Sequence, residues 1–320
     1  FPNFITPFRG GLIGENAPLI RTRICEGLDF LGGRTAEATI MFTDVRGFTT
    51  ITEEYGAQGT VSFLNDYFTM MVDCITREGG MLDKFIGDAI MACFGLPVAH
   101  DDDPDRAARA AISMIRELWE WNEERRAQGL KTVDMGIGLN TDMVVSGNIG
   151  SPKRMDYTVI GDGVNLASRL ESACKAYSAR ILVSESTVNK LRGTYRLRDI
   201  DLVIVKGKTQ PVRVFEMLDF HDTQTFPNLL DVVGHFSEGV SDYRAARWEK
   251  AIQRFEKLAE LEPDNRELYL ACAIAYKVLL KFRTIQGLTN NDSGQFIALE
   301  SLTKSEKIKL KSTFKTIKEL

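Results

Sequence analysis

The sequence predicts an α+β fold in which helices pack on a mixed β-sheet. Two observations favour this class: short apolar strand-like runs alternate with amphipathic helical patterns, and two of the strands are joined by a tight Gly-Asp turn instead of a crossover helix. A third is the end of the chain, where the pattern is helical alone and predicts a small all-α segment. With 320 residues, the chain has room for about two domains.

The first elements are predicted from apolar spacing and turn residues. Residues 36–43 form a β-branched run that predicts a buried strand ending at Asp44. A helical pattern then runs from Val61 to Ile75, with apolar residues three and four apart. Residues 81–94 predict a hairpin folded about Gly87 and Asp88.

Three consecutive aspartates followed by Pro104 indicate the start of the next helix. Acidic residues and proline favour a helix N-terminus, so we interpret the aspartates as capping residues and not as a metal site. The later elements are predicted as strands over 133–139, 143–149, 156–160, 181–184, 195–205 and 212–217, with helices over 164–177 and up to about 191. This order is typical of a ferredoxin-like β-α-β-β-α-β core.

Changes in composition predict five segments. They are a connector over 1–34, the main α+β domain over 35–219, a linker over 220–234, helices over 235–281 and a Lys-rich helical tail over 282–320. Within the fourth segment, five residues match the spacing of one tetratricopeptide repeat: Gly239, Tyr243, Ala251, Phe255 and Pro263. A generic helical hairpin is the alternative, and the tail does not continue the repeat.

Bulk composition excludes several classes of protein. The net charge of −4 gives no general attraction to nucleic acid. No apolar run approaches the roughly 20 residues of a membrane span. Five scattered cysteines favour neither a disulfide framework nor a zinc site, so we expect a cytoplasmic protein. Because the chain begins at Phe1, we expect it to be part of a longer protein.

Two aspartates point to metal chemistry. Asp44 ends the first predicted strand and Asp88 lies at the tip of the hairpin, so neighbouring strands would bring both carboxylates to one end of the sheet. Such oxygen ligands suit Mg²⁺. Gly47 and Phe48 allow the main chain to approach a metal or phosphate. Asn165 and Arg169 share a helical face and could hold ribose and phosphate oxygens, with an exposed polar face as the alternative.

Four ordered motifs carry a resemblance to a known family. They are Phe-Thr-Asp-Val-Arg-Gly-Phe-Thr (42–49), Asp-Lys-Phe-Ile-Gly-Asp-Ala (83–89), Ser-Gly-Asn-Ile-Gly (146–150) and Asp-Tyr-Thr-Val-Ile-Gly-Asp-Gly-Val-Asn-Leu-Ala-Ser-Arg-Leu (156–170). The sequence resembles class III adenylyl cyclases of the bacterial and cyanobacterial homodimeric kind over residues 35–218. The resemblance implies that this chain converts ATP to cyclic AMP and pyrophosphate.

The resemblance also implies roles for individual residues. Asp44 and Asp88, with Val45 beside the first, would hold two Mg²⁺ or Mn²⁺ ions. Asn165 and Arg169 would stabilise the transition state. Nucleotide contacts would come from the purine-reading Lys84 and Thr158, the triphosphate-binding Lys206 and Lys153, and Phe48. The site would lie between two subunits, one supplying the aspartates and its partner most of the other residues.

Hydrogen bonding favours ATP over GTP. Lys84 can only donate and so suits adenine N1, whereas the Thr158 hydroxyl can accept from adenine N6 but can also donate. A departure from the family pattern is Asp142, which we expect in a hairpin turn after Asn140 and Thr141.

The alternatives are a nucleotide-binding scaffold without turnover, a diguanylate cyclase and a polymerase-type palm. Every cyclase position is filled, the Gly-Gly-Asp/Glu-Glu-Phe hairpin of diguanylate cyclases is missing, and the basic surface of a polymerase is lacking. We further expect an upstream sensory domain that signals through residues 1–34, and a protein or intra-chain contact through the C-terminal helices.

Overall fold

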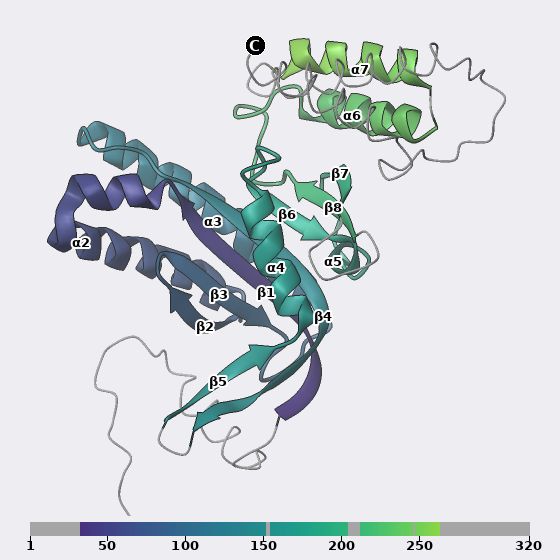
Figure 1. The fold of residues 1–320 in the computed structure, drawn as a ribbon. Helices are drawn as coiled ribbons and strands as arrows, with labels where there is room; N and C mark the ends of the chain where they lie inside the picture. Colours follow the sequence, from purple (N-terminus) through teal and green to yellow (C-terminus); the bar gives the residue numbers. More distant parts are fainter. Residues whose placement is uncertain (1–32, 152–153, 204–211, 246, 263–320) are drawn as a thin grey trace, which may run out of the picture. The chain divides into compact units, whose positions relative to one another are not determined.

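The computed structural model describes residues 33–151, 154–203, 212–245 and 247–262 (Figure 1). The predicted connector up to residue 32, Lys153, Lys206, the part of the predicted helical segment from residue 263 onward and the Lys-rich tail lie outside the described residues. The chain divides into two compact units. The first comprises the chain up to Ser172 together with Ser186–Arg192, and the second comprises Ala173–Glu185 and the chain from Gly193 onward.

The first unit is built on a long antiparallel pair of strands, β1 (Gly33–Arg46) and β4 (Asp134–Ser151), which pair over the whole of β1. β3 (Ala89–Phe94) pairs with the other edge of β1, and β2 (Met81–Ile86) pairs with β3. β5 (Arg154–Ile160) pairs with the second half of β4. The order of these strands is therefore β2-β3-β1-β4, with β5 beside β4.

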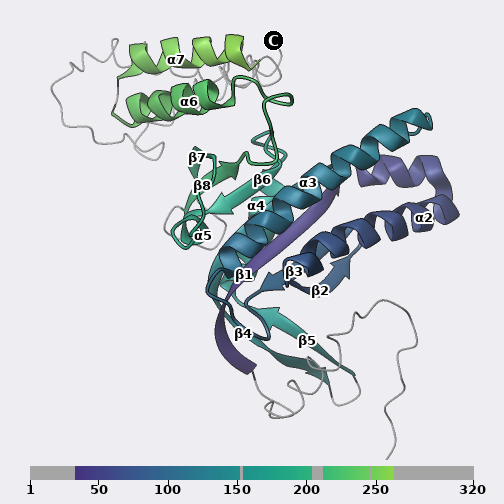
Figure 2. The same cartoon turned by 180° about the vertical axis from the view of Figure 1, so that it is seen from behind.

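Three helices cover this sheet: α2 (Phe48–Arg77), α3 (Asp103–Ala127) and α4 (Asp162–Ala173). Figures 1 and 2 view the molecule from opposite sides and show α4 on one face of the β1–β4 pair, with α2 and α3 on the other. α2 is interrupted at Gly56, whose φ of 63° and ψ of −179° are not helical. Glycine tolerates that positive φ without steric cost.

Alternation along β1 builds the core on both faces. Ala38 and Ile40 belong to the cluster that includes Val159 and Ala167, whereas Met41 points to the other face and is also fully buried. α4 packs closely on β4 because residue 138 is glycine: a Cβ there would lie 2.3 Å from the Ala167 carbonyl oxygen. The missing side chain sets how near α4 lies to the sheet.

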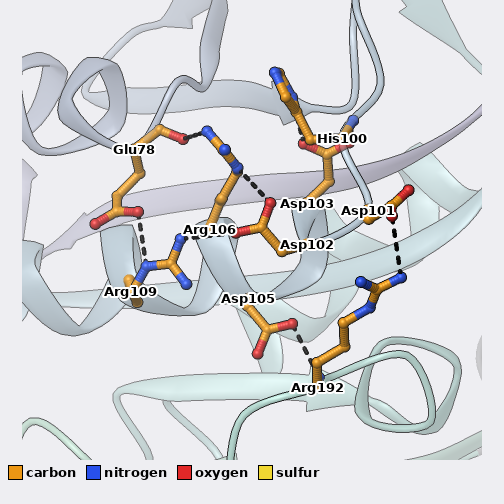
Figure 3. Close-up of polar contacts among 9 residues, drawn as sticks. All are labelled: Glu78, His100, Asp101, Asp102, Asp103, Asp105, Arg106, Arg109 and Arg192. Atoms are coloured by element: carbon orange, nitrogen blue, oxygen red, sulfur yellow. Dashed lines mark hydrogen bonds and ion pairs between the residues drawn. The ribbon is translucent and has the colours of Figure 1, made fainter.

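The three aspartates before α3 make protein contacts (Figure 3). Asp102 Oδ1 accepts a 2.7 Å hydrogen bond from Arg106 Nε, and Asp103 Oδ2 accepts a 2.6 Å bond from the His100 main-chain N. The predicted side-chain cap is wrong, because Asp102, at the N-cap position, makes no capping hydrogen bond and pairs with Arg106 and Arg109 instead. Within the described ranges, no three His, Cys, Asp or Glu side chains are placed to hold a metal ion.

The second unit contains a three-stranded antiparallel arrangement and two helices. β6 (Ile181–Ser184) pairs with β8 (Val212–Met217), and β7 (Leu197–Val203) pairs with the other edge of β8. The helices are α6 (Leu229–Arg244) and α7 (Trp248–Leu261). A short helix, α5 (Glu185–Val188), follows β6.

The α6–α7 hairpin has an apolar core centred on Phe255. Its ring lies edge-on to Phe236 at a centroid distance of 5.8 Å, and a Cβ at Gly239 would lie 3.1 Å from it. Ala251 is fully buried in α7, and Tyr243 contacts Trp248. The tetratricopeptide assignment stays a prediction, since Pro263 and the rest of the predicted helical segment to residue 281 lie outside the described residues.

Several predicted boundaries differ from the structure, and α2, predicted to begin at Val61, begins at Phe48. The turn at residues 140–142 is wrong, because β4 continues through it: Thr141 pairs with Thr39 of β1, and their hydroxyls are 2.8 Å apart. For the same reason β1 does not end at Asp44 but runs to Arg46 opposite Asp134. α4 ends at Ala173, before the predicted residue 177, and α6 begins at Leu229, inside the predicted linker.

None of the helices in the described part of the chain is both long and apolar enough to span a membrane.

Candidate active site

Asp44 and Asp88 lie together at one end of the β1–β3 strands, and we call them the acid pair. Asp44 is in β1 opposite Gly136, and Asp88 follows Gly87, whose φ of 66° forms the hairpin turn. Asp88 Oδ2 accepts a 3.3 Å hydrogen bond from the Val45 main-chain N, which fixes the turn against β1. The predicted convergence of the two carboxylates is therefore confirmed.

The electrostatics of the acid pair are unfavourable without a cation. Burial, followed by the hydrogen bond and charge of the neighbouring Asp88 carboxyl and by the charge of Glu171, raises the pKa of Asp44 to about 7. Among the described residues, no lysine or arginine forms an ion pair with Asp44 or Asp88. The nearby Arg46 donates a 2.9 Å bond to Asp134 instead.

These residues fit a divalent cation. Mg²⁺ is usually held by one or two protein carboxylates and completes its shell with water and substrate phosphates, so two facing carboxylates are sufficient. Their mutual repulsion, visible in the raised pKa of Asp44, is what a cation would relieve. Glu171 was missed by the sequence analysis; burial raises its pKa, and Asp88 adds to the effect. The signal for it was its place on α4, which Gly138 allows close to β4.

Val45 and Phe48 support the acid pair from the main chain. Val45 is 3% exposed, and its main-chain N donates to Asp88 Oδ2. The Phe48 ring packs on Phe63 at 6.4 Å between centroids, which holds the first turn of α2 next to Gly47. Gly47 has φ of 71° and precedes α2 directly. The predicted tight passage after Asp44 is confirmed.

Lys84 and Thr158 are brought together by a third residue, Asp83. Thr158 Oγ1 donates a 3.0 Å hydrogen bond to Asp83 Oδ2, and Lys84 Nζ lies 3.3 Å from the same oxygen. Lys84 and Asp83 are in β2 and Thr158 is in β5, two strands that are not paired with each other. Sequence analysis missed Asp83, for which the only signal was an acid directly before the lysine.

Asn165 and Arg169 lie on α4, as predicted, but the structure does not join them to the acid pair. Asn165 is exposed and its Nδ2 lies 3.5 Å from the Gly161 carbonyl oxygen. Arg169 is half-buried, and no described residue forms an ion pair with it. The chain thus presents an acidic half-site and a Lys84–Thr158 half-site as separate groups.

The chain is similar in sequence to two proteins named adenylate cyclases. The terminal-differentiation specific adenylate cyclase of Dictyostelium discoideum is 34% identical over 259 residues, which are 78% of this chain and 12% of that protein. An adenylate cyclase of Anabaena cylindrica is 40% identical over 199 residues, 60% of this chain and 39% of that protein. The chain therefore spans well under half the length of these two relatives.

Solved structures give the same fold for the shared region. The adenylyl cyclase CyaB from P. aeruginosa superposes with a TM-score of 0.56 at 36% identity, covering 59% of this chain and 97% of that one. The guanylyl cyclase Cya2 gives a TM-score of 0.55 at 38% identity, covering 58% and 94%. Residues 32–218 also match the family model for the adenylate and guanylate cyclase catalytic domain. The chain belongs to the adenylate and guanylate cyclase catalytic domain family.

Proposed function

We propose that this chain is an adenylate cyclase, which converts ATP to 3′,5′-cyclic AMP and pyrophosphate at sites shared by two copies of the chain. The observation that carries the proposal is the coexistence of a cation-ready acid pair and the Lys84–Thr158 pair in one member of the cyclase family. Each half-site offers chemistry that the other lacks.

The reaction exchanges one phosphoester bond for another. The ribose 3′-oxygen attacks the α-phosphorus, the bond from that phosphorus to the pyrophosphate oxygen breaks, and the 3′-hydroxyl proton passes to water or to Asp44. Two Mg²⁺ or Mn²⁺ ions held by Asp44 and Asp88 would supply charge neutralisation and a lowered 3′-hydroxyl pKa. Asn165 would orient the ribose, and Arg169 would contact the phosphoryl oxygens as charge develops there.

Further phosphate contacts would come from Lys206 and Lys153. Both are positive side chains near glycine or turn residues, suited to the β- and γ-phosphates. In base recognition, Lys84 would donate to adenine N1 and Thr158 would accept from adenine N6.

The proposed homodimer follows from the separation of the half-sites. Large apolar side chains near the Lys84–Thr158 pair are exposed: Phe85 by 45%, Ile86 by 49% and Ile160 by 51%. A second copy covering these residues would remove their apolar surface from water. It would also bring Asn165 and Arg169 of one copy to the acid pair of the other.

The first test is product formation from ATP or GTP with Mg²⁺ or Mn²⁺. We expect cyclic AMP as the main product and at least a hundredfold lower rate for Asp44→Ala, because the metal site supplies several kcal/mol of transition-state stabilisation. Asp73→Ala removes an exposed carboxylate of α2 and is the matched control. Absence of any cyclic nucleotide from a dimeric wild-type protein would contradict the proposal and favour a binding scaffold.

Mixing two inactive variants tests the shared site. The proposed site takes Asp44 from one copy and Arg169 from the other, so a heterodimer of Asp44→Ala and Arg169→Ala would keep one intact site. After exchange of subunits, about a quarter of the wild-type activity should return, since half of the dimers are mixed and each has one of two sites. Continued inactivity of the mixture, with mixed dimers shown to form, would contradict a site built from two copies.

Guanylate cyclase activity is the second candidate, favoured by the 38% identity to the guanylyl cyclase Cya2. Cyclic GMP as the main product would keep the family and the acid pair, but would overturn the assignment of Lys84 and Thr158.

Regulation and location are also part of the proposal. We expect a cytoplasmic enzyme whose connector, residues 1–34, transmits a signal from an upstream sensory domain, and whose C-terminal helices contact a protein or another part of the chain. Fusions to different upstream domains should differ in activity, whereas equal activity in every fusion would contradict this role of the connector.

A further inference from the structure

Asp83 is a buried acid with an incomplete set of partners. Its side chain is 0% exposed although the residues that follow it in β2 are exposed. One carboxylate oxygen, Oδ2, contacts Thr158 and Lys84, while Oδ1 is buried without a hydrogen-bond partner among the described residues. Burying a carboxylate is costly unless it is paired, and the contacts of Oδ2 with Lys84 and Thr158 offset part of that cost.

The strand geometry directs Asp83 toward β5. The pairing of β2 with β3 is irregular between Leu82 and Lys84: Leu82 pairs with Ala92 and Lys84 with the next residue, Met91. Asp83 is therefore the extra residue of a β-bulge. A bulge breaks the alternation of a strand and re-aims a side chain. Here it lets two consecutive residues, Asp83 and Lys84, interact with each other beside Thr158.

The hydrogen bond fixes the polarity of the Thr158 hydroxyl. A threonine hydroxyl has one proton to donate and two lone pairs to accept with. An anionic carboxylate has only acceptors, so the single Thr158 proton is held by Asp83 Oδ2. A nucleotide base that contacts the Thr158 hydroxyl therefore finds only a hydrogen-bond acceptor there. Lys84, 3.3 Å from the same oxygen and 43% exposed, presents only donors.

We propose that Asp83 is a specificity-determining positioning residue, which makes Thr158 an acceptor and thereby selects adenine over guanine. This inference rests on the proposed function of the site. The adenine N6 amino group would donate a hydrogen bond to Thr158 Oγ1. Guanine O6 is an acceptor, so it would face the Thr158 lone pairs without forming a hydrogen bond. Without Asp83 the hydroxyl is free to rotate and donate to guanine O6.

The test compares ATP with GTP in variants of Asp83. Asp83→Ala and Asp83→Val both delete the acceptor, and the second introduces a β-branched residue suited to a strand. We expect each to lower the ratio of kcat/KM for ATP to that for GTP about tenfold, the effect of one hydrogen bond. Asp83→Asn keeps an oxygen that can accept from Thr158, so it should retain most of the ratio. Asp73→Ala, at an exposed position of α2, is the matched control.

A double-mutant cycle separates this role from a general structural one. Thr158→Val removes the hydroxyl, so adding Asp83→Ala to it should change the nucleotide ratio less than twofold. An unchanged ratio in both Asp83→Ala and Asp83→Val would overturn the proposal. So would an equal further loss in the Thr158→Val background, because Asp83 would then act independently of Thr158.

Binding measurements keep the inference separate from the proposed activity. Calorimetric titration with non-hydrolysable ATP and GTP analogues in the presence of Ca²⁺ should show the same tenfold loss of preference in Asp83→Ala. If the wild type forms no cyclic nucleotide, the proposed function fails and the binding ratio still decides the role of Asp83. If the wild type is active and the binding ratio does not move, the inference alone fails.

Discussion

The acid pair of the first unit and a buried ion network in the second unit use the same residue types in opposite ways. In the second unit, Arg198 donates to Glu216 at 2.6 Å and to Glu262 at 2.8 Å, and all three side chains are at most 9% exposed. We call these residues the Arg198 network. In the first unit, Asp44 and Asp88 lie together without an arginine or lysine partner in the described part of the chain.

The two groups of acids differ in whether a nearby positive charge compensates the effect of burial on their pKa values. Burial raises the pKa of Glu216, but the charge and hydrogen bonds of Arg198 oppose the effect. At Asp44, burial and the neighbouring carboxyl of Asp88 act in the same direction and bring the pKa to about 7. A compensated network holds β7, β8 and the end of α7 together, whereas the two carboxylates of the acid pair fit a divalent cation.

Breaking the Arg198 network should have the largest effect on stability. Arg198→Ala removes the arginine that forms ion pairs with both Glu216 and Glu262, two buried carboxylates, so we expect a loss of about 3–5 kcal/mol in the free energy of unfolding. Arg213→Ala is the control: Arg213 is 38% exposed, and Arg244 also pairs with its partner Asp199. That change should cost about 1 kcal/mol or less. Urea unfolding of the two variants makes the comparison, and equal losses would contradict it.

Removing the charge of Asp44 from the acid pair should increase stability, in contrast to the Arg198→Ala change. The pKa of Asp44 is raised above its ordinary value, so its contribution to stability is complete at low pH and is lost as pH rises through about 7. In metal-free protein at pH 8, Asp44→Asn should therefore raise the free energy of unfolding by about 1–2 kcal/mol, after allowance for solvent screening. Urea unfolding with EDTA at pH 5 and pH 8 measures this, with Asp73→Asn as control.

The same variant should lose its response to metal. Mn²⁺ at ten times its dissociation constant should stabilise the wild type by about 1.4 kcal/mol and leave Asp44→Asn nearly unchanged. An equal response of both proteins would place the cation elsewhere.

The smallest effect is expected at His221 in the second unit. Burial, followed by the charges of Arg180, Arg196 and Arg198, lowers its pKa to about 4. The unfolded chain then binds the proton more tightly, so stability from this group is lost as pH falls from about 6.5 to about 4. His221→Gln should reduce this loss in the free energy of unfolding by about 1 kcal/mol, after allowance for partial exposure. Asp44 makes stability fall as pH rises over nearly the same pH range. If His221→Gln increased the loss of stability at low pH, the assignment of that loss to His221 would be contradicted.

Local sequence signals predicted the elements that depend on neighbouring residues. Gly87 and Asp88 form the predicted hairpin turn, because a positive φ favours glycine there. Strand 181–184 and the start of the α3 helix were also predicted correctly, since apolar runs and a proline at the first turn are local features. The convergence of Asp44 and Asp88 followed from placing both at the same end of neighbouring strands.

Other features depend on partners far away in the sequence. Residues 140–142 look like a turn, yet they remain in β4 because β1 supplies a partner along its whole length. Glu171 joins the surroundings of the acid pair only through the packing of α4 against Gly138. Neither position carries a local signal for its role.

The sequence by itself determined the family and the convergence of Asp44 and Asp88, because both can be inferred from motifs and from residue positions at the ends of strands. Only the tertiary structure decided that Asp83 meets Thr158, 75 residues later, across two strands that do not pair. It also decided which buried carboxylates have arginine partners. The physical reason is that hydrogen-bond polarity and charge compensation depend on distances between side chains, and the folded chain sets those distances.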